Sequence, residues 1–220
     1  MVTFDAVVFD LDGTLIERTQ DTAALYERTF ERVGIEPFAA PAELWAVLDG
    51  PPDPADEVGY LGAGFARLAA QHGRRVDAIA LAEAFVDGVD NAQVTLRPGA
   101  ERALSAARET APTAVLTNGP QSRQAAKVGA VGLAARVDTV VYAGDMPRRK
   151  PHAAPFEATL STLDATAERA LYVGDSLGYD VAGAHNAGLA AAYLDDGDGP
   201  DPYDPEYVLE SLADLPAVLR

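Results

Sequence analysis

Cysteine is absent from the 220-residue sequence, which excludes disulfide bonds, thiolate nucleophiles and zinc sites built on cysteine. Long apolar runs are absent too, since no stretch approaches the roughly 18 uninterrupted apolar residues of a membrane-spanning helix. The opening residues, MVTFDAVVFD, lack the basic segment that begins a signal peptide. We therefore expect a cytoplasmic protein with no membrane partner.

Positive charge is scarce. The chain has 17 Lys and Arg against 34 Asp and Glu, a net charge of −17, and its only lysines are Lys127 and Lys150. Binding to nucleic acid without sequence preference needs basic side chains at the phosphates, so nucleic acid is excluded as an expected partner. We interpret the acidic composition as adaptation to high salt, where screening weakens self-repulsion. The alternative is a genome that favours arginine codons.

The stretch AVVFDLDGTLI, residues 6–16, combines a strand with a pair of carboxylates. Its first four residues are apolar and rich in Val, which predicts a strand buried on both faces. Asp10 and Asp12 follow directly, and residues i and i+2 of an extended chain point to the same side. We therefore expect both carboxylates to face one small volume, with Gly13 allowing a sharp turn beside them. The pair indicates a divalent cation and phosphate chemistry.

A helical insertion is predicted after this stretch, over residues 17–96, and no strand is expected within it. Apolar residues recur there at steps of three and four, and breakers such as DGPPDP separate the segments. The remaining residues, 1–16 and 97–220, form the predicted core. The helices expected in the insertion run from Asp21 to Gly34, Pro41 to Leu48, Ala55 to Gln71 and Asp77 to Val89.

Strands and helices alternate from Gly99 onward, which predicts an α/β fold with a parallel sheet and right-handed crossovers. The expected strands are Thr113 to Leu116, Val137 to Tyr142, Ala170 to Val173, Leu189 to Leu194 and a short one near Tyr207. The ligand site of such a sheet lies outside the carboxyl ends of its strands. Polar residues follow four of these ends, so we expect them to meet at one rim: Asp10 with Asp12, Thr117 with Asn118, Lys150, and Asp175.

Four segments, AVVFDLDGTLI, AVLTNG, RRKPH and LYVGDSLGYD, resemble the four motifs of the haloacid dehalogenase superfamily in their order. The resemblance spans residues 7 to about 194. It implies a phosphohydrolase with a Rossmann-like, doubly wound core and an all-helical cap domain, residues 17–96, as in members similar to phosphoglycolate phosphatase or nucleotidases. Its substrate would be a small phosphorylated metabolite, and we expect a monomer or a homodimer.

The resemblance also assigns roles to the acidic residues. Asp10 would attack phosphorus to form an aspartyl-phosphate, and Asp12 would act as general acid and then as general base. Asp10, Asp175 and the backbone carbonyl of Asp12 would bind Mg²⁺, for which oxygen ligands are suited. Asp180 would orient Lys150 or a metal-bound water from outside the ligand set.

Three further residues would stabilise the transferring phosphoryl group: the Thr117 hydroxyl, the Asn118 backbone amide and the Lys150 ammonium. Each residue also has a structural interpretation, because an Asp or Thr after a strand commonly caps a turn or helix and a lone Lys is commonly solvated. The coincidence at four strand ends favours the catalytic interpretation. For Asp180, an N-cap role stays open.

Two other functions stay open at this stage. A metal-independent 2-haloacid dehalogenase shares the fold and the Asp nucleophile, although that branch typically lacks the second Asp that Asp12 supplies. A non-catalytic phospho-acceptor or binding protein could use the same kinds of residue on a doubly wound sheet. Receiver domains of that type, however, lack a helical insertion of this size.

Overall fold

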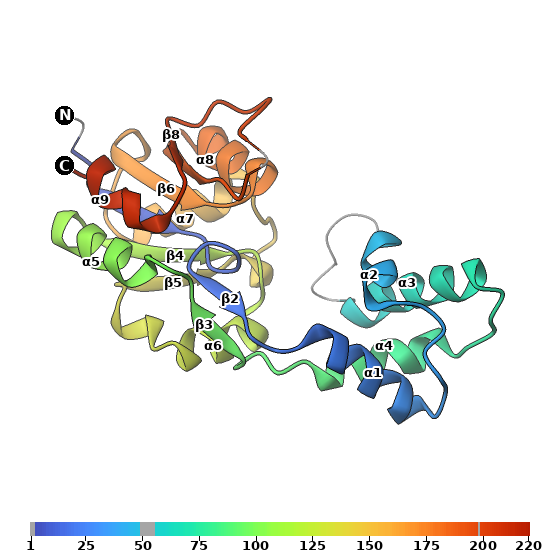
Figure 1. Cartoon of the computed structure of the whole chain (residues 1–220). Coiled ribbons are helices and arrows are strands. Elements are labelled where there is room, and N and C mark those ends of the chain that lie inside the picture. The colour runs from blue at the N-terminus through green and yellow to red at the C-terminus, as the bar shows by residue number, and fades with distance from the viewer. Residues whose placement is uncertain (1–2, 49–55, 198) are drawn as a thin grey trace. The chain divides into compact units, whose positions relative to one another are not determined.

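The computed structural model describes residues 3–48, 56–197 and 199–220 (Figure 1). The chain divides into two compact units, one formed by Met1–Arg18 with Asn91–Arg220 and the other by Thr19–Asp90. The expected division lay at 16/17 and 96/97, whereas these units divide at 18/19 and 90/91. We call the first the core unit and the second the helical unit.

The core unit contains a six-stranded sheet in the order β5-β4-β1-β6-β7-β8, and every neighbouring pair is parallel. If the six strands are numbered 1 to 6 by their place in the chain, their order across the sheet is 3-2-1-4-5-6. This is the order of a Rossmann-like sheet, so the predicted α/β fold is confirmed. The strands are β1 (Ala6–Phe9), β4 (Thr113–Thr117), β5 (Thr139–Tyr142), β6 (Ala170–Gly174), β7 (Ala190–Leu194) and β8 (Tyr207–Leu209).

Helices cover both faces of this sheet. Side chains alternate along β1, so Val7 and Phe9 enter one apolar cluster while Ala6 and Val8 enter the other. The first cluster includes residues of α5, α6 and α9, and the second includes residues of α7 and α8. The bounds are α5 (Ala100–Thr110), α6 (Gln121–Ala130), α7 (Ala153–Thr162), α8 (Ala182–Ala187) and α9 (Leu215–Val218).

A two-stranded antiparallel ribbon corrects the expectation that residues 17–96 contain no strand. It pairs β2 (Ile16–Arg18) with β3 (Val94–Leu96). Each strand has only three residues, and its partner lies almost 80 positions away, so no local periodicity marks either one. The ribbon belongs to the core unit and contains the segments where the chain leaves that unit and returns.

The helical unit contains α1 (Thr22–Val33), α2 (Pro41–Ala46), α3 (Glu57–Gln71) and α4 (Ala78–Gly88). Asp21 caps α1 by accepting from the amides of Ala23 and Ala24, and Gly34 ends it with a positive φ of 78°. Helix α4 packs against α1 and α3 around a separate apolar cluster that includes Phe30 and Phe65. No helix within the described residues is long and apolar enough to cross a membrane.

Candidate active site

The predicted site residues gather where four core strands end. Asp10 directly follows β1, Thr117 is the last residue of β4, Lys150 lies in the loop after β5, and Asp175 directly follows β6. Since β1 lies between β4 and β6, the carboxyl ends of these strands are neighbours. The sheet order thus brings residues more than 100 positions apart to one edge.

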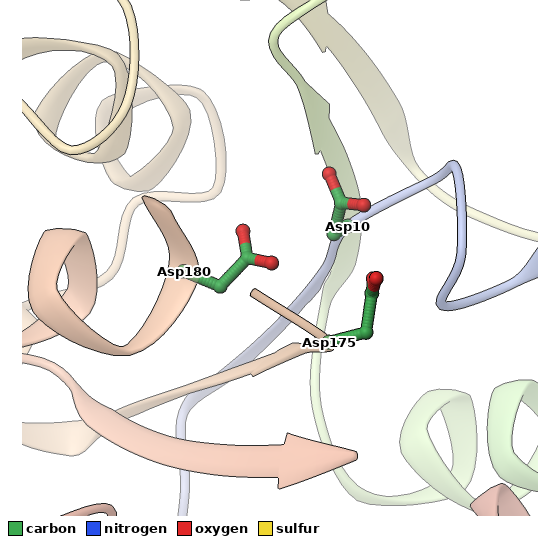
Figure 2. A group of neighbouring side chains, drawn as sticks. All are labelled: Asp10, Asp175 and Asp180. Atoms are coloured by element: carbon green, nitrogen blue, oxygen red, sulfur yellow. The ribbon is translucent and has the colours of Figure 1, made fainter. Parts of the chain in front are cut away.

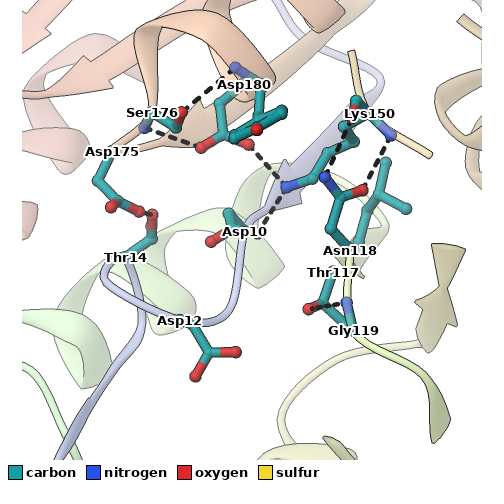
Figure 3. Close-up of polar contacts among 12 residues, drawn as sticks. Asp10, Asp12, Thr14, Thr117, Asn118, Gly119, Lys150, Asp175, Ser176 and Asp180 are labelled. Carbon is teal, nitrogen blue, oxygen red and sulfur yellow. Dashed lines mark hydrogen bonds and ion pairs between the residues drawn. The ribbon is translucent and has the colours of Figure 1, made fainter. Parts of the chain in front are cut away.

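The Lys150 side chain makes three hydrogen bonds at this edge. Its ammonium donates to Asp10 Oδ1 at 2.6 Å and to Asp180 Oδ1 at 2.7 Å (Figure 3). It also donates to the Tyr172 hydroxyl at 2.7 Å. The Lys150 side chain is only 2% exposed. Burial alone would lower the pKa of Lys150, but the carboxylates of Asp10 and Asp180 outweigh it and raise the pKa above its ordinary value.

Three carboxylates surround a small volume here. Oxygens of Asp10, Asp175 and Asp180 all lie within 4.8 Å of one another, and Figure 2 shows the three side chains converging. Burial raises the pKa of Asp10 to about 8 against the opposing effect of Lys150, and Asp180 and Asp175 add to the rise. Burial, followed by Asp180, likewise raises the pKa of Asp175. One ammonium therefore does not balance the three carboxylates.

This imbalance fits a bound divalent cation. Carboxylate oxygens are the ligands that Mg²⁺ prefers, and a cation among them favours their ionised form. Asp180 uses both oxygens within the protein, because Oδ2 accepts from the Ser176 amide at 2.9 Å while Oδ1 contacts Lys150. Asp10 and Asp175 are therefore the carboxylates with oxygens to offer a metal.

A π-helical turn, Leu177–Val181, directs Asp180 toward Lys150 in place of the N-cap role left open above.

The backbone around Asp175 leaves no room for larger residues. A Cβ on Gly13, whose φ is +86°, would clash with Asp175 Oδ2. A Cβ on Gly174 would clash with the carboxyl carbon of Asp180. Thr14 donates to Asp175 Oδ1 at 2.5 Å, which orients that carboxylate from the loop after β1. Gly13 therefore permits a close approach of the first and fourth motifs, and Gly174 permits Asp180 to lie close to the backbone within the fourth motif.

Asn118 fixes the loop that carries Lys150. Its side-chain oxygen accepts from the Lys150 amide at 2.9 Å, and its side-chain nitrogen donates to the Lys150 carbonyl at 3.1 Å. Only the backbone amide of Asn118 was expected to take part in the site, so this side-chain role is an addition. Thr117 lies beside it, and its hydroxyl oxygen accepts from the Gly119 amide at 3.2 Å.

Asp12 does not join the three carboxylates, contrary to the expectation that it would share one volume with Asp10. Figure 3 shows its carboxylate pointing away from Asp10. Its oxygens instead accept from Lys127 at 2.7 and 2.9 Å and from Gln124 Nε2 at 2.6 Å. The expectation assumed an extended chain, but the backbone turns at once: the amides of Leu15 and Ile16 both donate to the Leu11 carbonyl.

Four polar residues of this site were not predicted: Thr14, Gln124, Lys127 and Tyr172. Tyr172 accepts from Lys150 and donates to Asp180 at 3.1 Å, and burial raises its pKa well above the ordinary value. Lys127 had a usable signal, because it is one of two lysines in a chain that otherwise uses arginine. No such signal marked Tyr172 or Gln124. Tyr172 fits the pattern of an apolar strand, and Gln124 fits that of a polar helix face.

A family model described as haloacid dehalogenase-like hydrolase matches residues 4–188, most of the chain. The chain belongs to this family. The resemblance drawn from the four motifs is thereby confirmed.

Relatives within the haloacid dehalogenase-like family include named phosphatases. The chain is 32% identical over 202 residues to a phosphoglycolate phosphatase of Cereibacter sphaeroides, covering 87% of this chain and 85% of that one. It is 28% identical over 227 residues to a pyrimidine 5'-nucleotidase of Escherichia coli, covering 98% of each. A solved hydrolase of the family from Bacillus subtilis, bound to magnesium, shares the fold with a TM-score of 0.78 at 22% identity, covering 99% of each chain.

Proposed function

We propose that this protein is a Mg²⁺-dependent phosphatase that hydrolyses a small phosphate monoester through an aspartyl-phosphate on Asp10. The observation that carries the proposal is the buried Lys150 ammonium between Asp10 and Asp180, with Asp175 completing an excess of negative charge. A carboxylate held in this way is oriented for attack, and the ammonium attracts the phosphoryl oxygens. The phosphatase and nucleotidase relatives support the same reaction class.

The first half of the reaction uses Asp10 as nucleophile. One of its oxygens forms a bond to phosphorus while the bond to the leaving oxygen breaks, and Asp12 gives that oxygen a proton. Lys150, the Thr117 hydroxyl and the Asn118 backbone amide bind the transferring oxygens. In the second half, water attacks phosphorus, gives a proton to Asp12 and returns Asp10 as a free carboxylate.

Asp10 and Asp175, with the backbone carbonyl of Asp12, are the proposed magnesium ligands, and Thr14 and Asp180 orient the residues around them. Bound there, Mg²⁺ neutralises the carboxylate and phosphate charges that would otherwise repel each other. Lys150 stays paired with Asp180 in both halves of the proposed reaction, so the positive charge of Lys150 stays within the site.

The helical unit, Thr19–Asp90, is proposed to act as the cap that selects the substrate and excludes bulk water. Its substrate would be a small phosphorylated metabolite, in keeping with the names of the relatives. The net charge of −17 disfavours nucleic acid, and we propose a cytoplasmic monomer or homodimer.

The test is turnover of p-nitrophenyl phosphate by purified protein with and without Mg²⁺. We expect activity that EDTA abolishes, and no activity in Asp10→Asn. Asp5→Asn is the matched control, because Asp5 pairs with Arg169 on the surface near the same strand. Activity that persists in Asp10→Asn would contradict the nucleophile assignment.

Assays on the same purified protein distinguish the proposed phosphatase from the two other functions. Chloride release from a 2-haloacid without Mg²⁺ would favour the dehalogenase, whereas a stable phosphoprotein without turnover would favour the phospho-acceptor. A panel of phosphoglycolate, sugar phosphates and nucleoside monophosphates, assayed at high salt, would then identify the substrate class.

A further inference from the structure

Helix α6 directs two polar side chains at Asp12. Gln124 and Lys127 lie three positions apart, so they share one face of the helix. Both are buried, whereas most of their neighbours on α6 are exposed. Polar residues are rarely buried on a helix without partners, and here the partners belong to the site.

Gln124 joins Asp12 to Thr117. Its side-chain nitrogen has two hydrogens, and it donates to Asp12 Oδ2 at 2.6 Å and to Thr117 Oγ1 at 2.7 Å. Thr117 Oγ1 also accepts from the Gly119 amide. A hydroxyl has two acceptor positions and one hydrogen, so Thr117 is left with its hydrogen to donate. The proposed partner of that hydrogen is a phosphoryl oxygen.

Lys127 binds both oxygens of Asp12, and the two side chains differ in exposure. The Lys127 side chain is 6% exposed and that of Asp12 is 43% exposed. Turning Asp12 away would remove both contacts from a buried ammonium, which is strongly unfavourable. The exposed part of the Asp12 carboxylate, in contrast, stays open to substrate and water. The pair therefore holds Asp12 at α6 while leaving it accessible.

This placement suits an in-line displacement. The nucleophile and the leaving oxygen lie on opposite sides of phosphorus, so the acid that protonates the leaving oxygen must stand apart from the nucleophile. Asp12 points away from Asp10, in agreement with that requirement (Figure 3).

We propose that Lys127 and Gln124 are positioning residues that fix the Asp12 carboxylate relative to Thr117. The inference rests on the proposed phosphatase reaction and deepens it. Lys127 holds the Asp12 carboxylate in place for its proton transfers. Gln124 contacts Asp12 and also orients the Thr117 hydroxyl. Neither residue contacts the reacting atoms itself.

The two chemical steps depend on Asp12 to different extents when the substrate is p-nitrophenyl phosphate. In the first, an Asp10 oxygen bonds to phosphorus and nitrophenolate departs with the electron pair, needing no proton because it is a stable anion. In the second, the water oxygen bonds to phosphorus and its proton passes to Asp12. The bond from phosphorus to Asp10 breaks with its electrons returning to the carboxylate, and Asp12 later releases the proton to solvent.

The experiment is stopped-flow release of nitrophenolate by the full chain with Mg²⁺, followed into the steady state. For Lys127→Met we expect a burst of about one equivalent per active site at the wild-type rate. Steady-state turnover should then be about 10- to 100-fold lower, the usual effect of misplacing a reacting group. Asp12→Asn should show the same burst with still slower turnover. Lys127→Arg, which keeps the charge, should recover part of the turnover.

Gln124→Leu is the second variant, and it should slow both phases because Thr117 also loses its orientation. Val128→Ala is the control for packing, since Val128 is the buried neighbour of Lys127 in the core cluster. Val128→Ala should lower thermal stability without slowing steady-state turnover relative to the burst.

Three results would overturn the inference: wild-type turnover in Lys127→Met, an equal fall of burst rate and turnover in that variant, or the same kinetic pattern in Val128→Ala. Failure of the phosphatase proposal is distinguishable, because then the wild-type protein itself would form no phosphoenzyme and release no nitrophenolate. That result would reject the inference together with the reaction on which it rests.

Discussion

The hydroxyl of Thr14 donates a 2.5 Å hydrogen bond to Asp175, a residue 161 positions later in the chain. The bond joins the loop after β1 to the end of β6, and it orients one of the two carboxylates proposed to bind Mg²⁺. Partners of this kind outside a ligand set typically change metal affinity when they are removed.

Replacing Thr14 by Val should therefore weaken Mg²⁺ binding about 10- to 100-fold, because the isosteric side chain cannot donate. The measurement is the rise in melting temperature as a function of Mg²⁺ concentration. Thr14→Ser keeps the hydroxyl and should behave as the wild type. An unchanged Mg²⁺ dependence in Thr14→Val would show that Asp175 is oriented without this bond.

Gly13→Ala and Gly34→Ala form a matched pair. Both glycines have positive φ, +86° and +78°, but only Gly13 has an atom in the way of a Cβ. Gly34→Ala should lose about 1–2 kcal/mol of stability in urea unfolding from the backbone conformation alone. Gly13→Ala should lose more and should also lose the Mg²⁺-dependent rise in melting temperature, because the new methyl group displaces Asp175. Equal losses in the two variants would reject this explanation.

Acid should remove a small stabilisation supplied by Glu206. Partial burial opposes its ionisation, but hydrogen bonds from the Ala191 amide, at 2.7 Å, and from His185 leave its pKa below the ordinary value. A carboxyl with a lowered pKa stabilises the fold above its unfolded-state pKa, about 4.3, and the effect disappears as pH falls through the folded-state value. The contribution should be below about 1 kcal/mol, since the side chain is 48% exposed.

The comparison for Glu206 is urea unfolding of the wild type and Glu206→Gln. The wild type should be the more stable at pH 6, and the difference should vanish near pH 3. A difference that persists at the lower pH would assign the effect to packing or to the neutral hydrogen bond.

Salt should stabilise the whole protein if its acidity is an adaptation to a high-salt cytoplasm. At a net charge of −17, self-repulsion is strong in dilute buffer and is screened over a Debye length of only about 3 Å at 1 M salt. Thermal melts should therefore shift upward from dilute buffer to molar KCl. Equal or greater stability in dilute buffer would favour the alternative of a genome rich in arginine codons.

The sequence by itself determined the core fold and the principal residues of the site. Apolar runs alternating with helical periodicity are local signals, and they placed β1, β4 and β6 within a residue or so of their observed bounds. Because parallel strands end at one edge of a sheet, the same signals are enough to predict that Asp10, Lys150 and Asp175 lie together. Their roles in catalysis stay predictions that the experiments above test.

Only the tertiary structure decided which side chains meet there. Tyr172 lies in an apolar strand, and nothing within that strand shows that its hydroxyl would reach Lys150. The rule for extended chains misplaced Asp12, because a turn in the loop directs it to Gln124 and Lys127, more than 100 positions away. Periodicity reports which face of an element is buried, whereas contacts between polar groups depend on how distant elements pack, which no local pattern contains.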